Sequence, residues 1–449
     1  MRARVWAEIW AEILGRASGV KAVFAECLER FILASLAAAY RILALSAALA
    51  LFGCAGGSGG ENGGAGGNGG DGGDGEYGAL AQSGAGASGA LFAGGSAAEG
   101  RGSAAHAPGN FKGRQLSISR LRFLGRNFGS ALEKNGARAG GMCVVQNGKT
   151  LYMSVWDFPE NADKPALDKA AGLPPAAGRL PDFGVNSPVP LGKSSVALIS
   201  LSMLSGGKIR FDEPVERYCS FFKFGGGQGG SVTAAHLLSM TSGLGSDADA
   251  LVPRSPSDGG IFEIAAQISP SAAPGLLAED SALGVQLACE AAAYAENPAS
   301  KNFKKSFVAS MRKNLFSPLG MDSVRLCDSG NPLFLMRGFC LSLADISKWL
   351  ECETSPSPKI SDARSVAARR NCVSGKGSRA LGWLDTGRAG VRYAVCGDDY
   401  LGCANVAAVF GDYSCAVAFF AVGKKDARGA AVCACALEDF VSMLTDSEN

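Results

Sequence analysis

The stretch of residues 188–215 constrains the fold more than any other part of the chain. Its apolar positions cover most of the circumference of a helix: Val196, Leu198, Ile199, Leu201, Met203 and Leu204. A helix that is apolar all round belongs inside a large domain, because no side of it suits water. Pro190 is expected in its first turn, where proline is tolerated, and the glycine pair at 206–207 ends it. The sequence therefore predicts a buried central helix.

Further elements can be predicted around this helix. Residues 116–135 carry apolar residues at helical spacing before Gly136, which indicates an amphipathic helix. Two β-rich runs flank Asn147 and Gly148, a strong hairpin signal. Residues 406–410 and 414–422 indicate two core strands, and residues 430–444 a closing helix.

Several segments resemble one known family. Gly-Lys-Ile at 207–209 and Asp-Glu-Pro-Val at 212–215 are similar to a pattern that follows the nucleophile helix of the serine β-lactamase and penicillin-binding protein family, in its class C and esterase-like branch. Similar family segments lie at 233–244, 315–322 and 338–349. The resemblance covers roughly residues 115–445. It implies an α/β (α+β) fold, a mainly antiparallel sheet with helices on both faces and a helical region inserted at about 215–338.

The family's first catalytic motif is Ser-x-x-Lys. Counting back from residues 207–209, the resemblance places its lysine on Lys193 and its serine on Pro190. This chemistry needs a hydroxyl one helical turn before the lysine, so that the amine takes the proton as oxygen attacks a carbonyl. Proline has no nucleophile to supply.

The two other catalytic motifs differ from the family pattern as well. The resemblance places Tyr-x-Asn on Glu279, Asp280 and Ser281, after a Pro-Gly turn at 274–275. Lys-Thr-Gly or His-x-Gly, on an edge strand beside the site, falls near Cys396 and Asp398. These changes favour a non-catalytic member that keeps a binding or envelope scaffold role.

The alternative is a serine hydrolase of β-lactamase, esterase or D,D-peptidase type with a rewired nucleophile. Ser187, Ser194 and Ser281 are the candidates for that role. His236 is expected to be a structural helix residue rather than a base, because nothing nearby in the sequence supplies its nucleophile.

Lys193 is a cation on an otherwise apolar helix. A buried, unpaired ammonium is costly, so it either becomes neutral or finds a carboxylate. Glu279, Asp280 and Asp398 occupy positions where the family keeps neutral or basic groups. We therefore expect at least one of them to contact Lys193.

The N-terminal segment, 1–54, is expected to be a secretion signal. Arg41 precedes an apolar run of about a dozen residues, too short for a membrane span, and Cys54 follows it. Leu-Phe-Gly-Cys at 51–54 resembles a bacterial lipobox, which implies a lipid on Cys54 and a place in the bacterial cell envelope, outside the cytoplasm. The alternative is a signal anchor that begins near Phe31. Residues 55–110 are rich in Gly, Ala and Ser and are expected to form a flexible tether, with the folded domain at 111–449.

Composition narrows the remaining classes of partner. A formal net charge of +2 gives no reason to expect nucleic acid. No cofactor is expected, and no metal, because paired C-x-x-C units are missing. Gly-Lys-Ser at 192–194 is not a phosphate loop, since its first glycine would fall on Ser187. The partners that the resemblance implies are the membrane, through the lipid, and a peptidoglycan-like or peptide ligand in the family's cleft.

Cysteine usage leaves the redox question open. Of 14 cysteines, 12 remain when Cys27 and Cys54 are set aside, an even number in a compartment that favours disulfides if the chain is exported. Cys415, Cys433 and Cys435 lie in apolar or alanine-rich segments and are expected to be small buried hydrophobes. The sequence does not decide whether any pair is bonded.

Overall fold

The structure is a computed structural model that describes residues 115–161, 183–224, 232–253, 260–327, 331–371, 379–423 and 428–445. The predicted signal segment with Cys54 and the predicted tether lie outside the described residues. Among the residues that are described, no helix is both long enough and apolar enough to cross a membrane.

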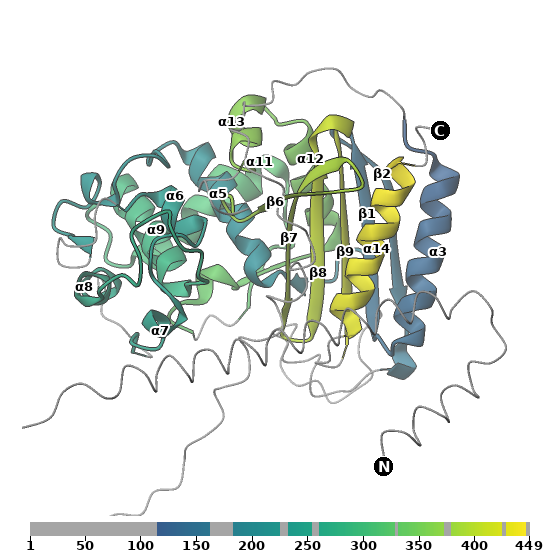
Figure 1. Ribbon diagram of the computed structural model, residues 1–449, viewed down its shortest axis with the longest axis horizontal. Helices are drawn as coiled ribbons and strands as arrows, with labels where there is room; N and C mark the ends of the chain where they lie inside the picture. The colour runs from purple at the N-terminus through teal and green to yellow at the C-terminus, as the bar shows by residue number, and fades with distance from the viewer. Residues whose placement is uncertain are drawn as a thin grey trace, which may run out of the picture. The chain divides into compact units, whose positions relative to one another are not determined.

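A six-stranded antiparallel sheet organises the described part of the chain, in the order β2-β1-β9-β8-β7-β6 (Figure 1). Its strands are β1 (Ala139–Gln146), β2 (Lys149–Asp157), β6 (Leu384–Arg388), β7 (Val391–Tyr400), β8 (Cys403–Phe410) and β9 (Cys415–Val422). The first hairpin thus pairs with the last strand, from Ala139 opposite Val422 to Gln146 opposite Cys415. Its turn has φ of 52° at Asn147 and 72° at Gly148, which the Asn-Gly pair tolerates, and this confirms the predicted hairpin.

Helices cover both faces of the sheet, because residues alternate between two cores along each strand. Met142 and Val144 pack with α3 (Ile118–Lys134) and α14 (Arg428–Thr445). Cys143 and Val145 pack into the other core, with α12 (Leu343–Thr354) and the helical region. In Figure 1, α3 and α14 lie together on one side, and α12 lies on the other. This confirms the predicted fold class.

The helical region lies between the central helix and α12. Its helices are α6 (Ala234–Leu238), α7 (Ser246–Asp249), α8 (Gly260–Gln267), α9 (Ala282–Glu296), α10 (Phe303–Met311), a π-helical turn (Arg312–Phe316) and α11 (Ser317–Leu319), and α13 (Ala363–Ala368) follows α12. Short 3₁₀ turns are η1 (Pro159–Asn161), η2 (Gly192–Ser194), η3 (Val215–Arg217), η6 (Phe334–Met336) and η7 (Gly411–Tyr413). A second sheet, in the order β3-β5-β4, is built from β3 (Val189–Pro190), β4 (Arg325–Leu326) and β5 (Phe339–Leu341).

The predicted central helix is α5 (Ser195–Gly206), and it is buried without a break from Ser195 to Met203. It ends at Gly207, whose φ of 60° is left-handed, as predicted. Gly382 approaches it so closely, at φ +83°, that a Cβ there would meet the backbone of Val196 and Ala197. The helix is thus packed on all sides.

The start of this helix was predicted wrongly. Pro190 lies in β3, where it pairs with Cys340, and not in the first turn of α5. Since β3 is the edge strand of its sheet, a missing N–H is tolerated there. Gly192, with φ +56°, then turns the chain into η2, and α5 begins only at Ser195.

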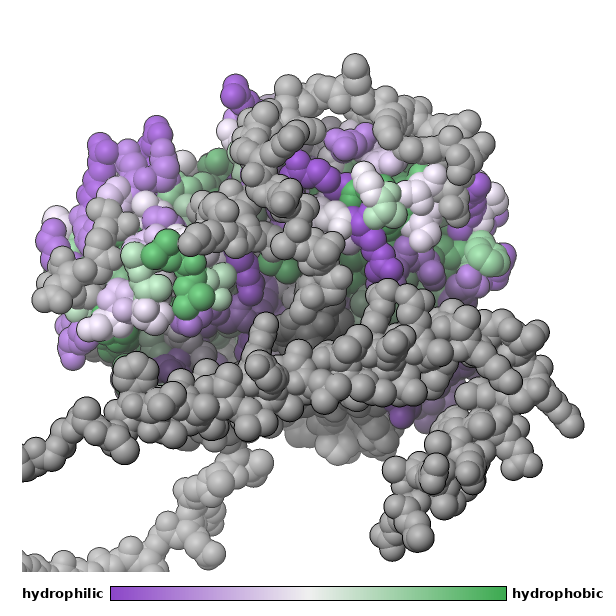
Figure 2. Space-filling model, in the orientation of Figure 1, coloured by the Kyte–Doolittle hydropathy of each residue, from purple (hydrophilic) through white to green (hydrophobic). Residues whose placement is uncertain are grey.

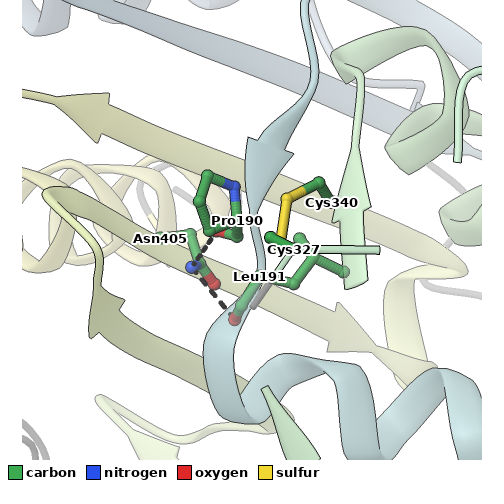
Figure 3. Close-up of a disulfide and its surroundings, with 5 residues drawn as sticks. All are labelled: Pro190, Leu191, Cys327, Cys340 and Asn405. Carbon is green, nitrogen blue, oxygen red and sulfur yellow. Dashed lines mark hydrogen bonds between the residues drawn. A yellow bond between two sulfur atoms is a disulfide. The ribbon is translucent and has the colours of Figure 1, made fainter. Parts of the chain in front are cut away.

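The cysteines divide into one bonded pair and several buried thiols. Cys327 and Cys340 form a disulfide beside Pro190 and Leu191 (Figure 3). Cys415 and Cys433 are buried as predicted, and burial raises the pKa of both thiols. Cys435 is exposed, so its predicted burial is wrong, because it lies on the outer side of α14.

Candidate functional site

Lys193 lies in η2, between β3 and α5. Its side chain is 15% exposed, and its ammonium forms an ion pair with the carboxylate of Asp280. The backbone N–H of Lys193 donates to Oδ2 of Asp398 at 2.9 Å. The prediction that a carboxylate contacts Lys193 is therefore confirmed. Two of the three proposed carboxylates meet this one residue.

Asp280 directly precedes Ser281, the N-cap of α9. Arg379 approaches its other oxygen, with Nη2 3.4 Å from Oδ1. Burial raises the pKa of this carboxyl, but the hydrogen bond and charge of Lys193, together with the charges of Arg379 and Arg337, leave it below its usual range. Asp280 is therefore an anion at neutral pH, held between cations.

Asp398 lies on β7 and is 4% exposed. Nε of Arg337 is 3.3 Å from its Oδ2, and the guanidinium of Arg337 lies over the ring of Tyr400, 5.5 Å from the centroid. Gly192 is needed here, because a Cβ at this position would meet the Asp398 side chain. The third motif position thus carries an anion, and the neighbouring cation comes from another element.

The local topology explains why β7 reaches the site. Within the described residues, β6 pairs only with Val391–Val395, so the half of β7 that begins at Cys396 has no strand partner on that side. That half contacts η2 instead, through the bond from Lys193 to Asp398. Cys396 itself is buried, and burial raises the pKa of its thiol to about 12, so it supplies no thiolate at neutral pH.

The candidate hydroxyls are occupied elsewhere. Ser194 donates from Oγ to Oδ1 of Asn405 at 2.8 Å. Ser281 caps α9, accepting from the N–H of Gly284 at 3.0 Å and donating to Asp249 at 3.3 Å. Ser187 accepts from the N–H of Gly184 at 3.0 Å, in the loop before β3. None of these three hydroxyls has its hydrogen bond with Lys193.

Two further predicted residues have structural roles. Glu279 accepts a hydrogen bond from Ser271 at 3.1 Å rather than pairing with Lys193. His236 forms a capping box with Thr233, whose N–H donates to Nδ1 of the imidazole at 3.3 Å. Burial lowers the pKa of His236. Its predicted structural role is confirmed.

Sequence reasoning missed four residues at this site: Arg337, Arg379, Asn405 and Ser195. Asn405 donates to the carbonyls of Pro190 and Leu191 at 3.3 and 3.2 Å, and so holds the start of η2 against β8 (Figure 3). As a lone amide in the apolar run of β8, it could have been noticed. Ser195 is fully buried, and its hydroxyl has no hydrogen-bond partner among the described residues. The two arginines stand in no recognisable pattern.

The arrangement can hold charge but lacks the parts of an acyl-transfer site. A protonated amine in an ion pair has no lone pair with which to accept a proton. In the described part of the chain, no cluster of three or more His, Cys, Asp and Glu side chains is placed to hold a metal ion.

Comparisons with known proteins place the chain among related folds. The β-lactamase family model matches residues 124–329. A crystal structure described as a β-lactamase/D-alanine carboxypeptidase from Yersinia pestis, complexed with citrate, has a TM-score of 0.57 and 15% sequence identity, and covers 73% of this chain and 100% of its own. At this identity the likeness shows the fold. A search of curated proteins finds no match.

Proposed function

Because the chain belongs to the serine β-lactamase and penicillin-binding protein family, we propose that it is a non-catalytic member that acts by binding or as a scaffold at the cell envelope. The ion pair between Lys193 and Asp280 carries this proposal. It ties up the amine that the family's chemistry would use as a base.

The positions around the ion pair support the same proposal. Pro190 lies in a strand and supplies only its carbonyl, which accepts from Asn405. Ser194 and Ser195, the hydroxyls nearest in sequence to Lys193, are both buried. Acyl transfer needs a hydroxyl that reaches both a base and a carbonyl of the substrate.

The ligand class that suits the site is a peptide or peptidoglycan-like molecule with a free carboxylate. Three cations, Lys193, Arg337 and Arg379, surround Asp280 at contact distance or through their charge. A carboxylate of a ligand that displaced Asp280 would meet the same three donors. The structural neighbour was crystallised with citrate, an anion, which is in keeping with this chemistry.

The direct test is incubation of the purified protein with a fluorescent penicillin, followed by a denaturing gel. We expect no covalent band. Pro190→Ser should also stay at background, because residue 190 lies in β3 and a hydroxyl there does not share a helix face with Lys193.

A covalent band from the unmutated protein would support the alternative, a hydrolase with a rewired nucleophile. Replacing Ser187, Ser194, Ser195 or Ser281 by alanine would then name the nucleophile, since loss of the band identifies the acylated hydroxyl. Boiling the protein before incubation is the control for non-specific labelling.

The envelope location rests on the sequence around Cys54. A radioactive fatty acid fed to bacteria that make the protein should label it, because a lipobox cysteine is acylated. Cys54→Ala should abolish the label, whereas Cys27→Ala should leave it unchanged. A label that persists without Cys54 would exclude it as the anchor.

A further inference from the structure

The outer face of α3 combines exposed cations with exposed apolar side chains. We define this face by Ile118, Arg120, Arg122, Phe123 and Arg126, all exposed, with Phe123 the most prominent apolar member at 58%. The opposite face of α3 packs on the sheet. In Figure 2, the visible surface over α3, at the right of the view, mixes hydrophilic and hydrophobic residues.

The arginines of this face do not serve the helix itself. The first turn of α3 holds no acidic residue, and cations near a helix N-terminus oppose its dipole. Within the described residues, Arg120, Arg122 and Arg126 form no ion pair, and Arg126 instead lies over the ring of Phe123, 5.9 Å from its centroid. Their charge is therefore available to a partner. The small net charge of the chain hides this local excess.

The combination of cations and an apolar tip fits one kind of surface. Anionic lipid headgroups attract cations, and an aromatic side chain between them can enter the headgroup layer. A polyanion in solution would use the arginines but would leave Phe123 without a role. Chain order points the same way, because α3 is the first described element after the predicted tether and Cys54.

We propose that the outer face of α3 docks on the surface of a bilayer that contains anionic phospholipid. This goes beyond the proposed function and does not require Cys54 to carry a lipid. The arginines contact phosphate groups, and Phe123 enters the layer between them. Docking places α3, and with it one face of the sheet, against the membrane.

The test uses the full chain and two kinds of vesicle, one of phosphatidylcholine and one with added phosphatidylglycerol. The ratio of the two binding constants isolates the contribution of anionic lipid, since the apolar N-terminal segment binds both vesicles. We expect the ratio to exceed one and to fall in high salt. Replacing Arg120, Arg122 and Arg126 by glutamine together should lower the ratio about 100-fold, given the usual contribution of a cation near a charged bilayer.

The matched control replaces three exposed cations of the helical region, Lys301, Lys305 and Arg312, by glutamine. It should leave the ratio unchanged. Phe123→Ala should weaken binding to the anionic vesicles, and circular dichroism should show that both α3 variants stay folded, because all four positions are exposed. An equal loss in the control variant would overturn the proposal. So would binding to a soluble glycerol-phosphate polymer that equals vesicle binding and ignores Phe123→Ala.

Discussion

Asp280 is the residue on which the electrostatics of the candidate site converge. It pairs with Lys193, lies 3.4 Å from Arg379, and feels the charge of Arg337. Burial alone would raise the pKa of this carboxyl, so its lowered pKa means that the cations outweigh desolvation. The folded state therefore favours the ionised form of Asp280.

Asp280→Asn should lower the free energy of unfolding at neutral pH by about 1–2 kcal/mol, less than for a fully buried pair, since Asp280 is partly exposed. A carboxyl whose pKa is lower in the folded state contributes stability above its unfolded pKa of about 4, and that contribution is lost as the pH falls through the folded pKa. The variant should thus lose less stability on acidification. Urea unfolding across this pH range measures both effects.

The control for this experiment is Asp212→Asn. Asp212 pairs with Arg210, but both side chains are about 70% exposed, so solvent screens the pair and the change in stability should be small. Identical acid sensitivity of Asp280→Asn and the parent protein would show that the ion pair does not stabilise the fold.

A buried charge cluster joins three helical elements beneath the site. Glu353 of α12 accepts hydrogen bonds from Arg369 at 2.7 Å and Arg370 at 2.6 Å, at the end of α13. Arg369 also donates to the carbonyl of Ala197 and the hydroxyl of Ser200 in α5. Burial raises the pKa of Glu353, but the two arginines hold it below its usual range. The cluster fixes α5 against its neighbours.

Glu353→Gln should destabilise the protein by about 3–5 kcal/mol, because it leaves two buried arginines without an anion. Chemical denaturation measures the loss. Glu438→Gln is the matched control, since Glu438 pairs with Arg388 on the surface, where ion pairs contribute about 0–1 kcal/mol. Similar losses in both variants would mean that the buried cluster has no special weight.

At the level of elements, regular patterns predicted well and charged ones did not. Spacing alone located α3, α14 and the hairpin at Asn147, because each buries one face whose period is visible locally. Pro190 was misplaced because its pairing with Cys340 is remote in sequence. Glu353 sits at the end of α12 in a polar stretch, and a buried carboxylate there cannot be told from a surface residue without its arginines. The partner of Lys193 could be predicted, since burial of a cation demands one.

For the whole molecule, the disulfide between Cys327 and Cys340 bears on both stability and compartment. It closes a short loop, with a sequence separation of 13, next to β3 and η2. Replacing both cysteines by serine should cost about 3 kcal/mol, the loop-entropy value for a ring of about this size. Denaturation with and without reductant measures it: reductant should lower the parent to the level of the variant and leave the variant unchanged.

Alkylation under non-reducing conditions is the companion measurement. Cys327 and Cys340 should resist the reagent in denaturant until a reductant is added, whereas Cys435, which is exposed, should react at once. Modification of Cys327 before reduction would mean that the bond does not form, and with it would go one reason to place the protein in an oxidising compartment.

The pairing of β1 with β9 sets the order in which the protein can be assembled. The first strand made lies beside the last, and most of the described chain separates them. A ribosome must therefore release almost the entire body before the sheet can close, and until then Met142 and Val144 have no core to enter. A nascent chain that stalls before Cys415 keeps these apolar residues exposed, so it depends on a chaperone to stay out of aggregates.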